Sequence, residues 1–381
     1  NNMTDQATSY KLSTFSDDSI IQTLGCKVTK STDLPPTYQQ LEEIEVQRRE
    51  VLRGGERPFW RIVLSWNGTC LRALCFDWLI WVPIGVFVTL RILLRQREMM
   101  DILEDSNIDI LGGFLSFFLV HFVNQTNTRF FEMYKLAKSV GGKITEITCV
   151  ISTTFRPAAA LRLVRYLNAA HAVGYVGLSG PYSKEHFFDH INEEYNLLTE
   201  SEVEIIGRHG WNSESFLEIV SWCQHDIRKA KTEGVIDSGE MRELNKLILG
   251  FKDSMETIYD YCEQPVHFFY IHFLCLLSAL YLPLFALENA FSVGSNDEWS
   301  SEVITGLIVI LQSTFVIGLR LLGQKMVDPY GDDLEDLSVL SYVKCAIEEC
   351  QMILSAKNNV TDIDESLEKK MATKPAKNVI T

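Results

Sequence analysis

The sequence has no glycine-rich phosphate loop, no GxSxG elbow and no pair of CxxC clusters, the patterns that indicate nucleotide binding, serine hydrolysis and structural zinc. Nine cysteines are scattered over 381 residues without the spacing of a disulfide framework. Basic residues are in deficit, because 35 Lys and Arg stand against 50 Asp and Glu for a net charge of -15. We therefore expect neither an enzyme nor a nucleic-acid partner, since binding phosphates requires a basic surface.

The sequence does contain four blocks of apolar residues, with the charged residues between and beyond them. Blocks of this length predict membrane-spanning helices. We expect the spans at about 76–95, 108–126, 265–288 and 303–323. The segments at about 127–264 and 324–354 show helical periodicity, and no segment alternates between apolar and polar residues as a strand does. The expected fold is all-α, with four transmembrane helices continuous with a helical domain outside the membrane.

The two ends of the chain, 1–45 and 355–381, are polar, and we expect them to be flexible tails around one domain of 46–354. Lys and Arg gather before the first span and after the second, whereas 288–302 has none. By the positive-inside rule, both termini and the helical domain lie on the cytoplasmic side or its organellar equivalent, although Arg91, Arg95 and Arg97 at the far end of the first span count against this. A plasma membrane and an organellar membrane such as the thylakoid both remain open.

The second apolar block is the shortest and most polar of the four, since it contains Asp109 and His121. It also contains an aromatic series, Phe114, Phe117, Phe118 and Phe122. One interpretation is that these rings pack against lipid and neighbouring helices. The other is that one i,i+4 line faces the axis of a symmetric oligomer, where stacked apolar rings gate by dewetting and their positive edges tolerate anions. His121 lies on the line of Gly113 and Phe117, and an ionisable group inside a span is a functional candidate.

Five carboxylates lie within nine residues just after the fourth block, around a Pro/Gly turn. They are Asp328, Asp332, Asp333, Glu335 and Asp336. Oxygen ligands in such a turn suit calcium. The same side chains also suit the start of the helix that follows, where the helix dipole favours negative charge. Spacing alone leaves both interpretations open.

Several stretches, in this order along the chain, resemble elements of the bestrophin family of anion channels. They are Ser65–Thr69 before the first span, Arg129–Phe131 after the second, Arg165–Asn168 and Tyr259–Pro265 in the helical domain, and Asp328–Gly331 at the acidic turn. Order and spacing agree over about residues 50–350. The resemblance implies a homopentamer in a lipid bilayer, with one axial pore that passes monovalent inorganic anions such as chloride and bicarbonate.

The resemblance also implies positions for two constrictions of that pore. The neck falls either on Gly113, Phe117 and His121, on an ungapped match, or on Phe114, Phe118 and Phe122, after a shift of one residue. The family usually has three apolar side chains at the neck, so the ungapped match departs from it by a glycine and a histidine. The second aperture, in the cytosolic part, falls on Ile236.

The family's calcium clasp uses two carboxylates three residues apart together with backbone carbonyls. Asp333 and Asp336 match that spacing, with Asp332 and Asp328 beside them, and Leu52 is the candidate for a carbonyl from a neighbouring subunit. Asp328 stands where the animal members have Asn, which brings this segment closer to bacterial and plant members and leaves calcium gating open.

Two rival functions also stay open, a cation-selective channel of the same fold and a non-conducting membrane scaffold.

Overall fold

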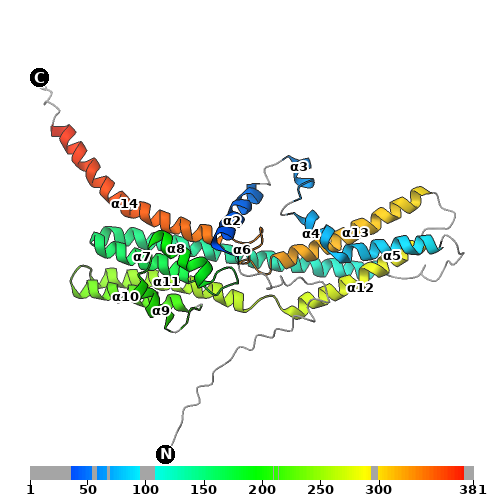
Figure 1. Cartoon of the computed structure of the whole chain (residues 1–381), viewed down its shortest axis with the longest axis horizontal. Coiled ribbons are helices and arrows are strands. Elements are labelled where there is room, and N and C mark those ends of the chain that lie inside the picture. Colours follow the sequence, from blue (N-terminus) through cyan, green and yellow to red (C-terminus); the bar gives the residue numbers. More distant parts are fainter. Residues whose placement is uncertain are drawn as a thin grey trace, which may run out of the picture.

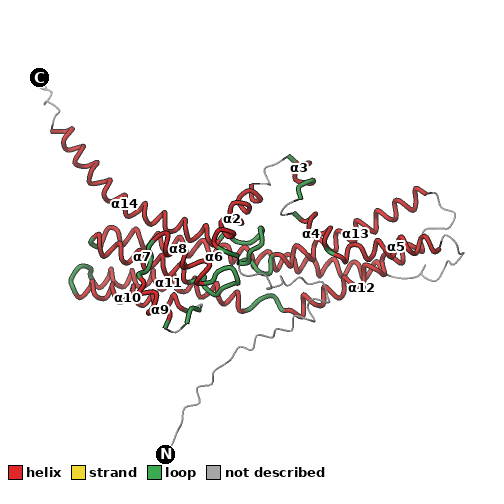
Figure 2. Tube along the Cα trace, in the orientation of Figure 1, coloured by secondary structure: helices red, strands yellow, loops and turns green. Residues whose placement is uncertain are grey.

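The computed structural model describes residues 36–53, 58–66, 69–94, 108–208, 210–212, 214–292 and 299–372. Over these residues the chain is helical, and Figure 2 shows helices and loops but no strand. The prediction of an all-α fold is therefore confirmed. The helices form an elongated bundle, in which two halves follow one another along the long axis (Figure 1).

One helix, α6 (Ile108–Thr154), runs through both halves and contributes to the hydrophobic core of each. Its buried side chains recur every three or four residues, which is the spacing of one helix face. The buried apolar residues are Leu115, Leu119 and Phe122 in the first half and Met133, Ala137, Val140, Ile144, Ile147 and Ile151 in the second. The second predicted span therefore continues without a break into the helical domain, over about 70 Å at 1.5 Å per residue.

The first half holds the apolar helices. They are α4 (Cys70–Phe76), α5 (Trp78–Leu94), α12 (Phe268–Ser292) and α13 (Trp299–Lys325). α12 and α13 pack against the first part of α6, and α5 packs against both of them. By length and composition α6, α12 and α13 can each cross a membrane, and the number rises to four if α4 and α5, which meet at a 60° bend, form one span. The predicted four-span layout agrees with this upper count.

Two glycines allow the helices of the first half to approach one another closely. Gly112 in α6 lies against the ring of Tyr281 in α12, and Gly323 in α13 lies against the ring of Phe122 in α6. A Cβ atom at either glycine would collide with the facing ring. Small residues at such crossings are typical of helices in lipid, where close packing rather than hydrophobic burial stabilises the pair.

The second half surrounds the remaining part of α6. Its helices are α7 (Pro157–Val173), the π-helical turn η2 (Lys184–Phe188), α8 (Asp189–Tyr195), α9 (Glu200–Gly207), α10 (Ser215–Thr232), α11 (Ser238–Glu263) and α14 (Val339–Ala372). α7, α11 and α14 contact α6 directly, and α10 packs on α7 and α11. Capping boxes at Thr199 and Asp237 begin α9 and α11, because each side chain accepts a hydrogen bond from a backbone N–H of the first turn.

Both predicted tails are shorter than expected. α2 (Tyr38–Leu52) begins inside the first of them, where Thr37 and Gln40 form a capping box and Leu41 is buried. The short helix α3 (Phe59–Val63) follows it. At the other end α14 continues to Ala372, and its last residues, 365–372, are nearly all good helix formers. The remaining tail residues, 1–35 and 373–381, lie outside the described residues.

Candidate functional site

One face of α6 stays exposed along both halves of the subunit. Gly113, Phe117, Asn124 and Phe131 lie on this face. Phe117 is 67% exposed and Phe131 is 52% exposed, although both are large apolar side chains. Val120 lies on the same face at 53% exposure. The sequence prediction did not single out Val120, although its spacing from Phe117 and Asn124 is that of one helix face.

The two predicted neck lines differ in where the subunit places them. All three residues of the ungapped line, Gly113, Phe117 and His121, are exposed. The shifted line turns inward along its length, because Phe114 is 58% exposed, Phe118 is half-buried and Phe122 is 1% exposed. The Phe118 ring meets the edge of Phe273, with 6.1 Å between the ring centres, and Phe122 packs on Gly323. The burial of Phe122 counts against the shifted line.

The exposed rings of α6 form one continuous surface. Phe117 and His121 are nearly parallel, at 8° with 6.5 Å between ring centres, and Phe117 meets the edge of Phe118 at 5.7 Å. Asn124 and Gln125 follow on the exposed side. The surface therefore changes along α6 from aromatic rings to amide side chains, which offer both hydrogen-bond donors and acceptors.

Arg129 fixes α6 just beyond this surface. Its Nη1 donates to the carbonyl of Gln264 at 2.6 Å, its Nη2 donates to the carbonyl of Tyr261, and its guanidinium lies 5.5 Å from the centre of the Tyr261 ring. Both carbonyls lie at the C-terminal end of α11, where backbone carbonyls have no hydrogen-bond partner within the helix. A cation there is also favoured by the helix dipole. Arg129 thus joins α6 to the point where the chain passes from α11 toward α12.

Two ion pairs lie inside the first half. Arg320 of α13 pairs with Asp77 at the bend between α4 and α5, where Arg320 is only 2% exposed. Asp77 also accepts a hydrogen bond from the backbone N–H of Leu79 at 3.0 Å. Arg91 of α5 pairs with Glu302 of α13 at 2.7 Å. A buried charge such as that of Arg320 is costly unless it is paired. The Arg91–Glu302 pair is partly exposed, and both pairs join α13 to α5 and its bend with α4.

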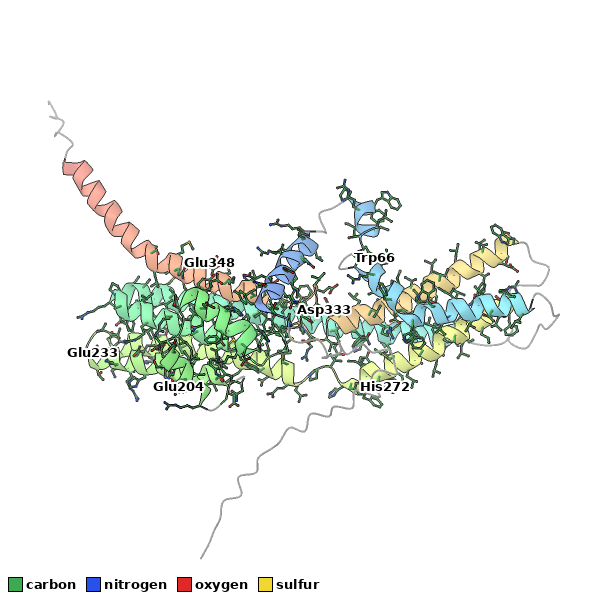
Figure 3. All side chains as sticks on the ribbon, viewed as in Figure 1. Trp66, Glu204, Glu233, His272, Asp333 and Glu348 are labelled. Carbon is green, nitrogen blue, oxygen red and sulfur yellow. The ribbon has the colours of Figure 1, made fainter. Side chains whose placement is uncertain are left out.

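The acidic turn lies between α13 and α14, at the junction of the two halves, where Figure 3 labels Asp333 next to α2. The Leu337 N–H donates to the Pro329 carbonyl at 2.8 Å and closes the turn. The Asp333 N–H donates to Oδ2 of Asp336 at 2.8 Å. A Cβ on Gly331 would lie 2.6 Å from that same Oδ2, so only glycine fits this close approach.

Two cationic side chains occupy the oxygens of this turn. Arg48 of α2 donates to the carbonyls of Gly331 at 3.1 Å, Asp333 at 2.7 Å and Leu337 at 3.2 Å. Lys325 lies 2.6 Å from Oδ2 of Asp333, and Asp332 is exposed. Burial, together with the nearby Asp333, raises the pKa of Asp336 to about 8.

These contacts test whether the calcium implied by the resemblance fits. Calcium takes six to eight oxygen ligands. One oxygen of Asp336 is buried without a partner among the described residues, but the Asp333 carbonyl and carboxylate are bonded to Arg48 and Lys325. The residues therefore do not fit calcium in this arrangement.

The remaining predicted site residues lie elsewhere. Ile236 is 5% exposed and packs in the core of the second half, one residue before the Asp237 cap of α11. Its burial counts against a role in lining an aperture, because its side chain points into its own subunit. Leu52 is the last residue of α2, and its side chain lies outside what the structure describes.

Comparison with known proteins agrees with this architecture. The model of the family described as "Bestrophin, RFP-TM, chloride channel" matches residues 48–356. Bestrophin homolog 14 of Caenorhabditis elegans is 20% identical over 303 residues, which cover 76% of this chain and 72% of that protein. Bestrophin homolog 13 of the same organism is 22% identical over 307 residues, covering 74% and 73%.

Solved structures show the same fold. Two crystal structures of variants of a bacterial bestrophin homolog from Klebsiella pneumoniae match with TM-scores of 0.63 and 0.62, at 16% and 15% identity. They cover 76% and 73% of this chain and 100% and 98% of theirs. The family match spans both halves, including α6 and the acidic turn. The chain therefore belongs to the bestrophin family.

Proposed function

We propose that this chain is one subunit of a homopentameric channel that passes monovalent anions such as chloride and bicarbonate. Members of the family are channels rather than enzymes, and the family and the apolar helices together indicate an integral membrane protein. The observation that carries the proposal is the exposed face of α6. We assign the pore neck to Gly113, Phe117 and His121 on that face, with Val120 beside them.

Lipid alone does not account for the exposed face. His121 and Asn124 are exposed on α6, and polar side chains of this kind are costly against hydrocarbon. The face also continues to Phe131 and Lys135, beside the helices of the second half, where a bilayer cannot cover it. A neighbouring copy of the chain or a water-filled pore covers both stretches at once.

The chemistry of this face suits anions better than cations. From residue 110 to residue 131, α6 contains no Asp or Glu. Cation channels select with rings of carboxylates or carbonyls, whereas this face offers aromatic ring edges and amide N–H groups, which carry partial positive charge. We do not propose modulation by calcium, because Arg48 and Lys325 already bond to the oxygens of the acidic turn.

Reconstitution tests the proposal against its non-conducting rival. Purified protein in liposomes loaded with chloride should release the anion when the charge is balanced by an ionophore, and native mass spectrometry should give the mass of five chains. Protein-free liposomes give the background rate. A pentamer that releases no chloride above this background would favour a membrane scaffold, and a monomer would remove the basis for an axial pore.

A further inference from the structure

The Arg48 guanidinium is almost completely buried and fully bonded. The side chain is 1% exposed, and a guanidinium carries five N–H donors. Nε donates to the Asp333 carbonyl at 3.0 Å, and Nη2 donates to that carbonyl and to Gly331. Nη1 donates to the Leu337 carbonyl and, at 3.3 Å, to the carboxylate of Glu45. Five bonds therefore use the five donors, and four of them end on three carbonyls of the acidic turn.

The helix that carries Arg48 is also held at its other end. Lys344 of α14 lies 2.9 Å from the carboxylate of Glu42 and 3.0 Å from that of Glu194. Tyr38 stacks on His190 with 4.8 Å between the ring centres. α2 is thus docked on the second half independently of Arg48, and this docking delivers the guanidinium to the turn.

Lys325 pairs with two carboxylates of the turn. Its ammonium lies 2.6 Å from the Asp333 carboxylate and 3.7 Å from the Glu335 carboxylate. Arg48 and Lys325 therefore approach the same residue, Asp333, from its carbonyl and from its carboxylate. A divalent cation at Asp333 would have to displace both charges.

We infer that Arg48 and Lys325 are the resident cations of the acidic turn, and that they hold it closed in place of calcium. The turn then stays folded without any bound metal. What fastens the junction between the last span and α14 is the docking of α2, and the concentration of calcium has no effect on it. This inference concerns binding at the turn and does not depend on conduction through α6.

Calcium binding by charge-removal variants tests the inference. The variants are Lys325→Gln, Arg48→Gln and the pair together. Arg49→Gln is the matched control, because Arg49 is exposed on the same helix and its side chain donates to the Glu45 carbonyl of its own helix rather than to the turn. Isothermal titration with calcium chloride, in detergent at pH 7 after treatment with a chelator, should show no saturable binding by the wild type or by Arg49→Gln. The double variant should bind with a Kd of about 0.1 to 1 mM, the range of weak protein calcium sites.

Thermal unfolding gives a second readout. Calcium at several times this Kd should raise the Tm of the double variant by several degrees through mass action, and should leave the Tm of the wild type unchanged. The Lys325 side chain is 38% exposed, so Lys325→Gln should still fold and can be tested alone if loss of Arg48 prevents folding. Saturable calcium binding by the wild type would overturn the inference. Variants that fold but do not bind calcium would also overturn it, because the charges of Arg48 and Lys325 would then not be what excludes the ion.

Discussion

Phe117 and Phe122 lie five residues apart on α6 and point in opposite directions. Phe117 is 67% exposed, whereas Phe122 is 1% exposed and packs against Gly323 and the ring of Tyr270, at 5.8 Å between centres. The same change at the two positions, Phe to Ala, therefore separates a pore residue from a packing residue. We expect Phe117→Ala to alter conduction and Phe122→Ala to alter stability.

The magnitudes follow from burial. Truncating a buried Phe costs about 3–5 kcal/mol in water-soluble cores. The lower end, about 3 kcal/mol, applies to Phe122, because truncating a side chain between helices in lipid removes packing contacts but little hydrophobic free energy. At roughly 2–4 °C per kcal/mol this lowers the Tm by about 6–12 °C. An exposed substitution such as Phe117→Ala changes stability by no more than about 0.5 kcal/mol.

The assay pairs thermal unfolding in detergent with single-channel recording in planar bilayers. Phe117→Ala should keep the wild-type Tm and the mass of the oligomer, and should raise the open probability because a smaller side chain leaves a wetter neck. Phe122→Ala should lower the Tm, with conduction by the surviving channels unchanged. Wild-type gating in Phe117→Ala would refute the assignment of the neck. Altered gating in Phe122→Ala at an unchanged Tm would favour the shifted line.

Three further substitutions test an ion pair of the first half, the Arg165–Glu202 contact between α7 and α9, and the Arg129 cap of α11. Asp77→Asn should leave the buried charge of Arg320 without its partner and cost about 3–5 kcal/mol, measured as a lower Tm, and an unchanged Tm would show that the pair is not buried in the membrane-inserted protein. Burial raises the pKa of Glu202, but hydrogen bonds from Arg165 and other groups lower it further, to about 2. The stabilisation is therefore present above the unfolded pKa near 4.3 and is lost as pH falls toward 2, so Glu202→Gln should cost about 1–2 kcal/mol at pH 7 and the deficit should vanish in acid. Arg129→Gln should speed hydrogen exchange at the end of α11, and exchange at the wild-type rate would contradict the role of Arg129 as its cap.

The exposed face of α6 illustrates how far sequence reasoning reached. The polarity of this span, with Asp109 and His121 inside it, marked it as the candidate pore helix. Periodicity alone did not tell which of the two lines faced outward. That choice depends on Gly323, which makes room for Phe122 from a helix about 200 residues further along the chain. Contacts of that separation have no local signature.

The acidic turn shows the opposite case. Five carboxylates around Asp328–Gly331 were visible in the sequence, but their partner was not. Arg48 reaches the turn from 285 residues away, on a helix that begins inside the expected tail of 1–45, where the capping box of α2 was overlooked. Ile236 was placed by its distance along a poorly matched stretch, and its burial could be known only after α10 and α11 had been packed together.

Reversal potentials in planar bilayers test the central claim most directly. With a gradient of potassium chloride across the membrane, a neck of Gly113, Phe117 and His121 without carboxylates should pass chloride, so the current should reverse close to the chloride equilibrium potential. Replacing potassium by a large organic cation should then leave that potential in place. Reversal close to the potassium equilibrium potential would contradict the account and identify the chain as a cation channel.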